Sequence, residues 1–249
     1  PLKQLLMAVL GIDIGGTGMK GALVDPLTGE LLSERFRVPT PQKRNPKSMA
    51  KAVHKIVTHF DYKGKVGVGF PTIIKNGVCL SSGNLHKSWK NQNVNEVFKE
   101  ETGLDFIVVN DADAAGYATM NYGVGKGETG LVLMVTIGTG LGSGAFYNGE
   151  LIPNFELGQI PYKKFKKIED WASNGAMQRE GLEIDEWAIR FSKFLKIAEL
   201  LIAPDLFILG GGLSKRYDEY KHLINANTPI RVAALRNNAG IVGAAAAVK

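Results

Sequence analysis

A carboxylate at the end of an apolar segment is the first candidate for chemistry in this sequence. Asn110 and Asp111 directly follow the apolar residues 106–109, where a helical pattern begins. An aspartate in this place can accept the proton of an attacking hydroxyl, as the catalytic aspartate of kinases does. It can also cap the following helix, a position that aspartate favours. Asp113 fits the helix-terminus role better than the catalytic one.

Two glycine-rich turns are the second candidate. Residues 13–20 read DIGGTGMK and residues 136–143 read TIGTGLGS, each after an apolar strand pattern. Glycines that end a strand leave backbone N–H groups directed at the turn, and such concavities hold phosphate oxygens. Thr17 and Lys20 add donors, and Asp13 is placed to orient Mg²⁺ through water, since this ion keeps most of its hydration shell. A plain glycine hairpin is the alternative for either turn alone.

A third glycine run, residues 210–212, follows the apolar residues 206–209 and precedes Ser214. Backbone N–H groups there suit a diphosphate or an adenosine. The three runs together predict that the two turns clamp the β- and γ-phosphates of a nucleotide, or neighbouring units of a phosphate polymer. The predicted contacts with the phosphoryl donor are Asp13, Gly15, Gly16, Thr17, Lys20, Gly138, Thr139, Gly140, Gly211 and Gly212.

Other signatures of nucleotide and metal sites fail. The sequence has no G-x-x-x-x-G-K-[ST]. The G-x-G-x-x-G at 125–130 precedes a strand pattern, whereas a dinucleotide site requires it to follow one. A single cysteine, Cys79, excludes a disulfide framework and a cysteine-based zinc site, which favours a reducing compartment, the cytoplasm. The four histidines lack metal-ligand spacing, and no G-x-S-x-G supports a hydrolase triad.

Two polar segments are candidates for holding a sugar. Residues 154–159 read NFELGQ and residues 82–85 read SGNL, and both offer side chains that hydrogen-bond to hydroxyl groups. Either segment is an ordinary loop unless the fold places it beside the other candidate residues.

The elements that must position these residues alternate between strands and helices, which predicts an α/β architecture. The strand and turn at 14–25 recur at 137–148 with a constant offset of 123 residues, which indicates two related lobes facing each other across a cleft. We expect a small lobe over 1–110, with the C-terminal helix 238–249 packed back on it, and a large lobe over 111–237.

The predicted strands cover 5–14, 20–24, 31–38, 66–70, 106–109, 130–137, 141–147 and 206–209. The predicted helices cover 46–60, 95–102, 112–122, 185–202 and 238–248.

The composition is that of an ordinary globular protein of 249 residues, with 45% hydrophobic and 22% charged residues. No apolar stretch approaches the length of a membrane span, and residues 5–12 lead into the first turn without a cleavage site for a signal peptide. The formal net charge of +6 favours anionic partners. The lysines at 163, 164, 166 and 167 form either a solvated strip or a contact for a polyanion.

With these residues assembled, the chain resembles the ROK (repressor, open reading frame, kinase) family over nearly its whole length. Within the family it is most similar to the branch of polyphosphate glucokinases and polyphosphate/ATP glucomannokinases. The resemblance implies an actin-like ATPase (hexokinase/ribonuclease H-like) fold with two lobes around a cleft, Mg²⁺ as cofactor, no zinc, and a homodimer. The segments that carry it are 11–20, 110–116, 137–143, 156–158, 204–215 and 235–244.

By motif match, the resemblance gives Asp111 the role of general base toward the 6-hydroxyl of glucose or a similar hexose. The family pattern Glu-x-Gly-His ends here in Gln159, which hydrogen-bonds but has no titratable group. The resemblance therefore implies a sugar kinase, with a hexose and ATP or polyphosphate as partners and neither nucleic acid nor membrane. The implied sugar contacts are Asn84, Asn110, Glu156, Gln159 and Glu169.

Two other classes of function remain open. One is a sugar-sensing regulator that keeps the fold without the activity, although no DNA-binding segment precedes Asp13 and Asp111 is intact. The other is a kinase of the same fold that acts on a non-sugar, which the set of Asn110, Asp111 and Glu156 disfavours. The sequence does not decide between polyphosphate and ATP as the donor.

Overall fold

The computed structural model describes residues 7–83, 85–234 and 238–248. The chain divides into two compact units: unit 1 comprises Pro1–Tyr122 with Asn237–Lys249, and unit 2 comprises Gly123–Arg236. The division expected after residue 110 differs from this one. Helix α4 (Asp111–Tyr122) packs on helix α9 (Ala239–Ala246), so both helices belong to unit 1.

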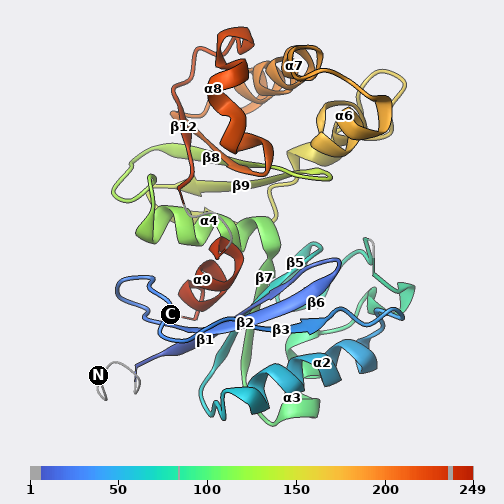
Figure 1. The fold of residues 1–249 in the computed structure, drawn as a ribbon, viewed down its shortest axis with the longest axis vertical. Coiled ribbons are helices and arrows are strands. Elements are labelled where there is room, and N and C mark those ends of the chain that lie inside the picture. The colour runs from blue at the N-terminus through green and yellow to red at the C-terminus, as the bar shows by residue number, and fades with distance from the viewer. Residues whose placement is uncertain (1–6, 84, 235–237, 249) are drawn as a thin grey trace. The chain divides into compact units, whose positions relative to one another are not determined.

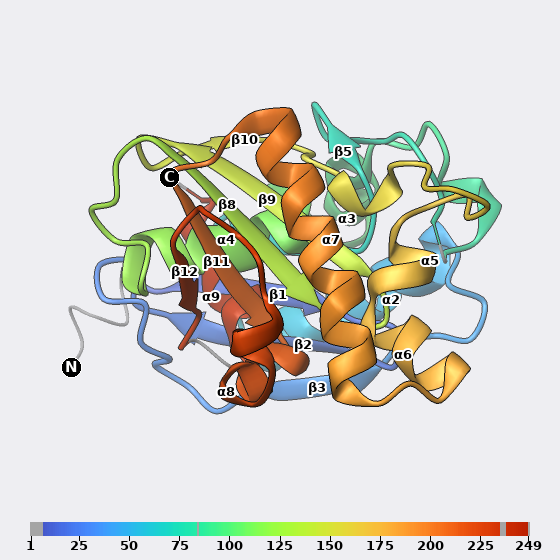
Figure 2. The same ribbon diagram turned by 90° about the horizontal axis from the view of Figure 1, so that it is seen from above.

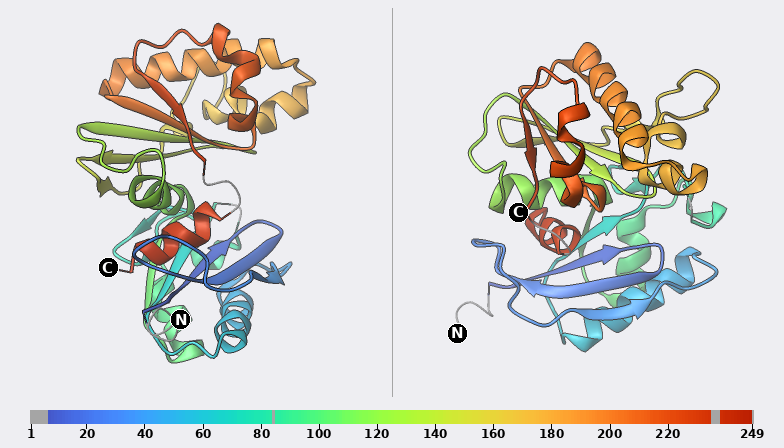
Figure 3. Two further views of the ribbon diagram at one scale, coloured as in Figure 1. Left: turned by 60° about the vertical axis from the view of Figure 1, so that its left-hand side comes forward. Right: turned by 45° about the horizontal axis from the view of Figure 1, so that its top comes forward.

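Unit 1 is built on a five-stranded sheet in the order β3-β2-β1-β4-β7. Strands β1 and β2 form an antiparallel hairpin, while β4 and β7 run parallel to β1. Helices α2 and α3 cover one face of this sheet, and α4 and α9 cover the other (Figures 1 and 3). The remaining elements of the unit are β1 (Val9–Ile14), β2 (Gly18–Val24), β3 (Phe36–Pro39), α2 (Pro46–His59), β4 (Val66–Phe70), β5 (Ile74–Lys75), β6 (Val78–Cys79), η1 (Lys87–Trp89), α3 (Val94–Thr102) and β7 (Phe106–Asn110).

The third strand of unit 1 is shorter than the sequence predicts. Residues 31–38 were expected to form it, but β3 begins at Phe36 and Leu31 makes only an isolated bridge to Val24. The Leu23 N–H donates to the Ser33 hydroxyl at 2.9 Å, a local side-chain bond that replaces a strand-to-strand bond. The prediction of a strand over 31–35 was therefore wrong.

Helix α9 approaches strands β1 and β4 closely because glycines face it. A Cβ atom added at Gly67 would overlap the carbonyl group of Ala244 in α9. At Gly69, two residues further along β4, an added Cβ would lie 3.3 Å from the Cβ atom of Ala114 and meet no backbone closely. The two glycines therefore differ in how much room an extra methyl group has.

We expect Gly67→Ala to lower the free energy of unfolding by about 1–3 kcal/mol, the usual penalty for overpacking a core. The carbonyl of Ala244 belongs to a helix and cannot rotate away. Urea denaturation measures the effect, and Gly69→Ala is the matched control with a smaller expected loss. Equal stability of the two variants would contradict the close packing of α9 on β4.

Unit 2 repeats the architecture with the strand order β10-β9-β8-β11-β12. Helix α7 lies along one face of this sheet (Figure 2), where Trp187, Phe191 and Phe194 share a hydrophobic core with residues of β8. The elements of the unit are β8 (Leu131–Ile137), β9 (Leu141–Tyr147), β10 (Glu150–Ile152), η2 (Leu157–Gln159), α5 (Glu169–Ala172), α6 (Asn174–Glu180), α7 (Ile184–Ile202), β11 (Leu206–Gly211), η3 (Leu213–Arg216), α8 (Tyr217–Tyr220), η4 (Lys221–Leu223) and β12 (Ile230–Val232).

The internal repeat seen in the sequence is a repeat of topology, with one difference in register. In both sheets a hairpin is followed by two strands parallel to its first strand. Asp13 pairs with Lys20, and Thr136 pairs with Gly142, so the offset is 123 on the first strand and 122 on the second. The constant offset expected along both strands was wrong by one residue, because the second hairpin is tighter.

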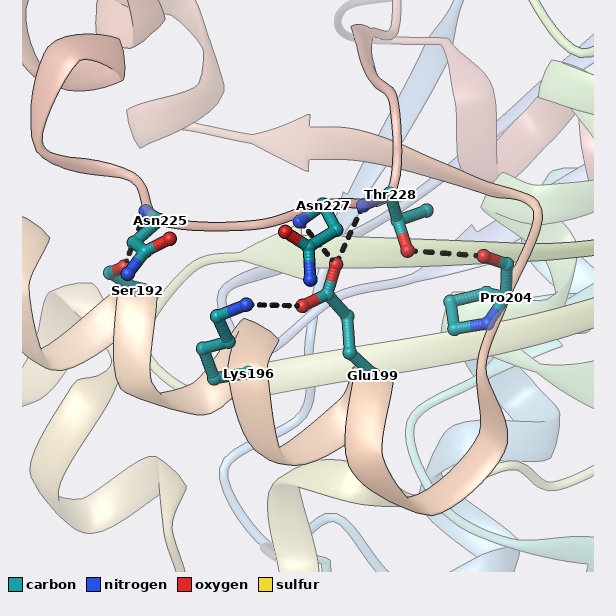
Figure 4. Close-up of polar contacts among 7 residues, drawn as sticks. All are labelled: Ser192, Lys196, Glu199, Pro204, Asn225, Asn227 and Thr228. Atoms are coloured by element: carbon teal, nitrogen blue, oxygen red, sulfur yellow. Dashed lines mark hydrogen bonds and ion pairs between the residues drawn. The ribbon is translucent and has the colours of Figure 1, made fainter.

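A half-buried carboxylate fastens the segment before β12 to helix α7 (Figure 4). Glu199 Oε1 accepts the backbone N–H groups of Asn227 and Thr228, each at 2.6 Å, and Oε2 accepts from Lys196 Nζ at 3.1 Å. Burial acts to raise the pKa of Glu199, but the hydrogen bonds from Thr228 and Lys196 outweigh it and lower the pKa. The ionised form of Glu199 therefore stabilises unit 2.

We expect Glu199→Ala to reduce the free energy of unfolding by about 1–3 kcal/mol, because two backbone donors lose their acceptor. Glu199→Gln keeps an acceptor oxygen and should lose less. Folding lowers the pKa of Glu199. The stability that its charge contributes is therefore fully present above the pKa of the unfolded state, and it is lost as the pH falls through the pKa of the folded state. Urea denaturation at neutral and acidic pH measures both effects. A Glu199→Ala variant with the stability of wild type would show that Glu199 does not stabilise unit 2.

Candidate active site

The polar residues of unit 1 lie where its parallel strands end. Asp13 pairs with Gly69 in the register of β1 and β4, and Phe70 pairs with Asn110 in the register of β4 and β7. Asp111 follows Asn110 as the first residue of α4. The carboxyl ends of parallel strands in open α/β sheets are where ligands bind. Asp13, Asn110 and Asp111 therefore share the edge of the sheet at which a site is expected.

The environment of Asp111 raises the pKa of its carboxyl above that of a solvated aspartate. The residue keeps solvent-accessible surface, while the protein around it displaces enough water to raise its pKa to about 6. The Ala112 N–H donates to Asp111 Oδ1 at 2.9 Å, which lowers the pKa and opposes this shift. The negative charge of Asp13 raises the pKa further. At neutral pH the carboxylate is ionised, accessible and more basic than a solvated aspartate.

Asn110 takes the capping role that the sequence offered to Asp111. Its Oδ1 accepts from the N–H groups of Ala112 at 2.7 Å and Asp113 at 3.2 Å, and its Nδ2 donates to Thr72 O at 3.3 Å. These are the bonds of a helix N-cap. Because Asn110 supplies the main cap, Asp111 is released from that role.

The first glycine turn is held by its carbonyl groups. The carbonyl oxygens of residues 15, 16 and 17 accept, in that order, from Thr40 Oγ1 at 2.6 Å, Arg44 Nη2 at 3.0 Å and Arg37 Nη2 at 2.9 Å. A trans peptide directs its N–H opposite to its C=O, so the N–H groups of these peptide units are directed away from the three partners. N–H groups that are held in a fixed direction are what a phosphate cradle requires.

The carboxyl of Asp13 is confined beside this turn. Burial raises its pKa, and the charge of Lys20, its partner across the hairpin, acts in the opposite direction. A Cβ atom at Gly240, in the first turn of α9, would lie 2.8 Å from Asp13 Cγ. Gly240 therefore leaves the space that the carboxyl occupies.

The second glycine turn and the third glycine run meet at one edge of the sheet in unit 2. Gly138 N donates to Gly140 O at 3.0 Å, and Gly138 O accepts from Gly175 N at 3.3 Å. Gly211 pairs with Ile137 in the register of β11 and β8, and its φ of +85° is one that glycine adopts readily. The structure thus brings the turn at 138–140 next to Gly211.

The predicted sugar contacts of unit 2 are tied to the same turn. Ser143 donates to Phe155 O and accepts from Leu157 N at 2.9 Å, which fixes the backbone on both sides of Glu156. Gln159 Nε2 donates to Glu169 Oε1 at 2.9 Å. Glu169 Oε2 in turn accepts from Leu141 N at 3.1 Å, at the end of the turn. Gln159 and Glu169 are therefore partners of each other.

The predicted site residues fall into two sets, and the sequence missed several that support them. Arg37, Thr40 and Arg44 lie in no motif, because they act through main-chain carbonyls. Ser143 and Gly240 lie in motif segments, but the sequence does not show their roles in packing and hydrogen bonding. Asn84 lies outside the described residues. Unit 1 holds Asp13, Gly15, Gly16, Thr17, Lys20, Asn110 and Asp111, and unit 2 holds Gly138, Thr139, Gly140, Glu156, Gln159, Glu169, Gly211 and Gly212.

The lysine-rich segment at 163–167 is largely occupied within unit 2. Lys163 Nζ lies 5.3 Å from the ring centroid of Tyr162, in the range of a cation–π contact, and Lys167 Nζ lies 3.2 Å from Glu169 Oε1. These contacts favour the interpretation as a surface strip over a dedicated polyanion site.

Two repeated sheets, each with a glycine turn after its first strand and with polar groups where its parallel strands end, define an actin-like ATPase fold. The chain belongs to the ROK family, whose model matches residues 9–154. It is 41% identical over 238 residues to a polyphosphate glucokinase of Mycobacterium tuberculosis, covering 95% of this chain and 89% of the relative. The resemblance inferred from the sequence is thereby confirmed.

Solved structures agree with this assignment. The inorganic polyphosphate/ATP-glucomannokinase of Arthrobacter sp. strain KM matches with a TM-score of 0.88 and 46% identity, covering 96% of each chain. A ROK family glucokinase of Streptomyces griseus, at 23% identity and a TM-score of 0.76, shares the fold. Among the described residues, no helix has the length and apolar character needed to cross a bilayer.

Proposed function

We propose that the protein is a sugar kinase that transfers a phosphoryl group from polyphosphate or ATP to the 6-hydroxyl of glucose or a similar hexose. The observation that carries the proposal is Asp111, an accessible carboxylate with a pKa of about 6 at the strand edge that also holds Asp13. The names of the relatives in Mycobacterium tuberculosis and Arthrobacter support the substrate classes.

The reaction follows from the roles of these residues. The ionised carboxyl of Asp111 accepts the proton of the hexose hydroxyl while the hydroxyl oxygen attacks the terminal phosphorus of the donor. The P–O bond to the rest of the donor breaks, and the shortened polyphosphate or ADP leaves with the electron pair. The N–H groups of Gly15 and Gly138 bond within their own turns, so the backbone N–H groups of residues 16–17 and of residues 139–140 would bind the phosphate oxygens, and Lys20 adds positive charge near Asp13.

The residues present fit Mg²⁺. This ion is usually held by one or two carboxylates together with substrate phosphates, and its other ligands are waters. Asp13 offers such a carboxylate beside the first turn, and no cluster of three or more metal-ligating side chains occurs among the described residues. When bound, Mg²⁺ neutralises charge on the transferring phosphates. Asp13 would hold it through water.

The remaining assignments are part of the proposal. Asn110, Glu156, Gln159 and Glu169, together with Asn84, would hydrogen-bond the hexose, with Gln159 oriented by Glu169. We also propose a cytoplasmic homodimer, as the family resemblance implies.

The direct test is an assay of hexose phosphorylation with each donor. Purified protein with Mg²⁺ and glucose or mannose should release glucose 6-phosphate or mannose 6-phosphate with polyphosphate, ATP or both. A chain that binds glucose but forms no phosphorylated sugar with either donor would instead be a sugar sensor.

A further inference from the structure

Unit 1 contains an open pocket of about 440 Å³ that adjoins the first glycine turn. Two of its lining residues touch the turn directly, because Thr40 Oγ1 and Arg44 Nη2 donate to the carbonyl oxygens of Gly15 and Gly16. The pocket therefore borders the first glycine turn on the side of its carbonyl groups. Its lining residues are Thr40, Gln42, Lys43, Arg44, Leu85 and His86, none of which is acidic.

The walls of this pocket are held in place. Arg44 has a φ of +45°, which is unfavourable for a residue with a side chain, and the fully buried Trp89 donates its indole N–H to Arg44 O at 2.9 Å. His86 Nδ1 accepts the Ser88 N–H at 3.2 Å, so a neutral imidazole carries its proton on Nε2 and can donate it to a ligand. These contacts pre-form a site with cationic and hydrogen-bond-donating side chains.

The positive charge of the protein is concentrated in the segment that builds the pocket. Residues 35–95 contain twelve of the 30 Lys and Arg residues and one of the 24 acidic residues, Asp61. The formal net charge of this segment is therefore +11, whereas the rest of the chain carries −5. Asp61 is itself paired with Lys63 at 2.7 Å. The pocket therefore belongs to a segment whose own net charge favours anionic ligands.

We propose that this pocket binds the inorganic polyphosphate chain beyond the phosphate that is transferred, an inference that rests on the proposed function. A phosphate polymer carries negative charge on every unit, so it gains from successive cationic groups past the cradle. An adenosine would require apolar or aromatic surface, and among the described lining residues only Leu85 is apolar. Lys43 and His86 contact the polymer, and Arg44 links the pocket to the turn at Gly16.

The test compares long-chain polyphosphate, tripolyphosphate and ATP as donors for wild type and for the double variant K43M/H86N. Asparagine at 86 can still accept the Ser88 N–H, so the local turn is kept. The KM for long-chain polyphosphate should rise by about fivefold or more, as expected for the loss of two ligand contacts. The KM values for ATP and tripolyphosphate should change less than about twofold. The salt dependence of KM for the long polymer should become shallower, because fewer counterions are released.

The matched control is K51M/K55M, which removes two exposed lysines of α2 that belong to the same basic segment but do not line the pocket. It should leave all three KM values nearly unchanged. An unchanged KM for long-chain polyphosphate in K43M/H86N, or an equal increase for ATP, overturns the proposal. The proposal is also overturned if the KM for long-chain polyphosphate rises in K163M/K164M and not in K43M/H86N.

The proposed function fails separately, if wild type phosphorylates no hexose with any donor. In that case equilibrium dialysis with long-chain polyphosphate still decides the question. Weaker binding by K43M/H86N than by K51M/K55M supports the pocket, and equal binding overturns it.

Discussion

Replacing Asp111 with asparagine lowers kcat by about 10²–10⁴-fold with either donor, the usual contribution of a general base. Asparagine keeps the shape of the side chain and can still accept the Ala112 N–H, but it cannot take the proton of the hexose hydroxyl. Hexose binding, measured by calorimetry, should persist. Near-normal turnover of Asp111→Asn would remove Asp111 from the catalytic role.

The pH profile separates catalysis from a structural role. Desolvation by the surrounding protein raises the pKa of Asp111 to about 6, so the carboxyl is protonated and inactive below that pH and ionised above it. For wild type, kcat/KM should therefore rise through a limb near pH 6, and the residual activity of Asp111→Asn should lack this limb. Because the pKa of Asp111 is higher in the folded state than in the unfolded chain, ionisation of Asp111 destabilises the fold as the pH rises past the unfolded-state pKa. Asp111→Asn should therefore be at least as stable as wild type at neutral pH.

The control for this prediction is Asp113→Asn, in the same first turn of α4. Asp113 is buried and its N–H is part of the cap that Asn110 forms. Its replacement should affect the stability of the helix and leave the limb near pH 6 in place. An identical loss of turnover in the two variants would indicate a disturbed helix in both.

How much the sequence predicts depends on whether a feature is local. The glycine turns, the strand before Asp111 and the helices at α2 and α7 follow from residue types at fixed spacing, and the structure has them within a few residues. Arg37 and Arg44 were missed because they act on the carbonyl oxygens of residues 16 and 17, far away in sequence. A main-chain acceptor leaves no trace in a motif.

Competition between neighbours explains the other differences. Asn110 and Asp111 both favour a helix N-cap, and propensity alone cannot rank two adjacent residues that share the preference. The structure gives the cap to Asn110. Likewise, the offset between the two hairpins depends on cross-strand pairing, in which Gly21 corresponds to Ser143 and not to Gly144. The boundary of unit 1 depends on the packing of α4 on α9, a contact between distant segments.

Adding a methyl group to either glycine turn should weaken the use of the phosphoryl donor without disturbing the fold. A Cβ atom built at Gly16 or at Gly138 meets nothing within 4 Å, and neither residue has a positive φ. Alanine therefore fits the fold at either position, and its methyl group would enter the space proposed for the donor phosphates. Gly16→Ala and Gly138→Ala should each raise the KM for the donor by about 5- to 150-fold, corresponding to about 1–3 kcal/mol of overpacking.

Gly103→Ala is the control for these two variants, because it should lower stability without changing the donor KM. An added Cβ there also meets nothing within 4 Å, but the residue ends α3 with a φ of +75°. Gly103→Ala should therefore lower the free energy of unfolding by about 1–2 kcal/mol and leave the donor KM unchanged.

Gly16→Ala and Gly138→Ala should keep the wild-type midpoint in urea and an unchanged KM for the hexose. A donor KM equal to wild type in Gly16→Ala would show that the phosphates do not approach the first turn, and the same result in Gly138→Ala would exclude the second. Because each turn is tested by its own variant, either can fail without the other.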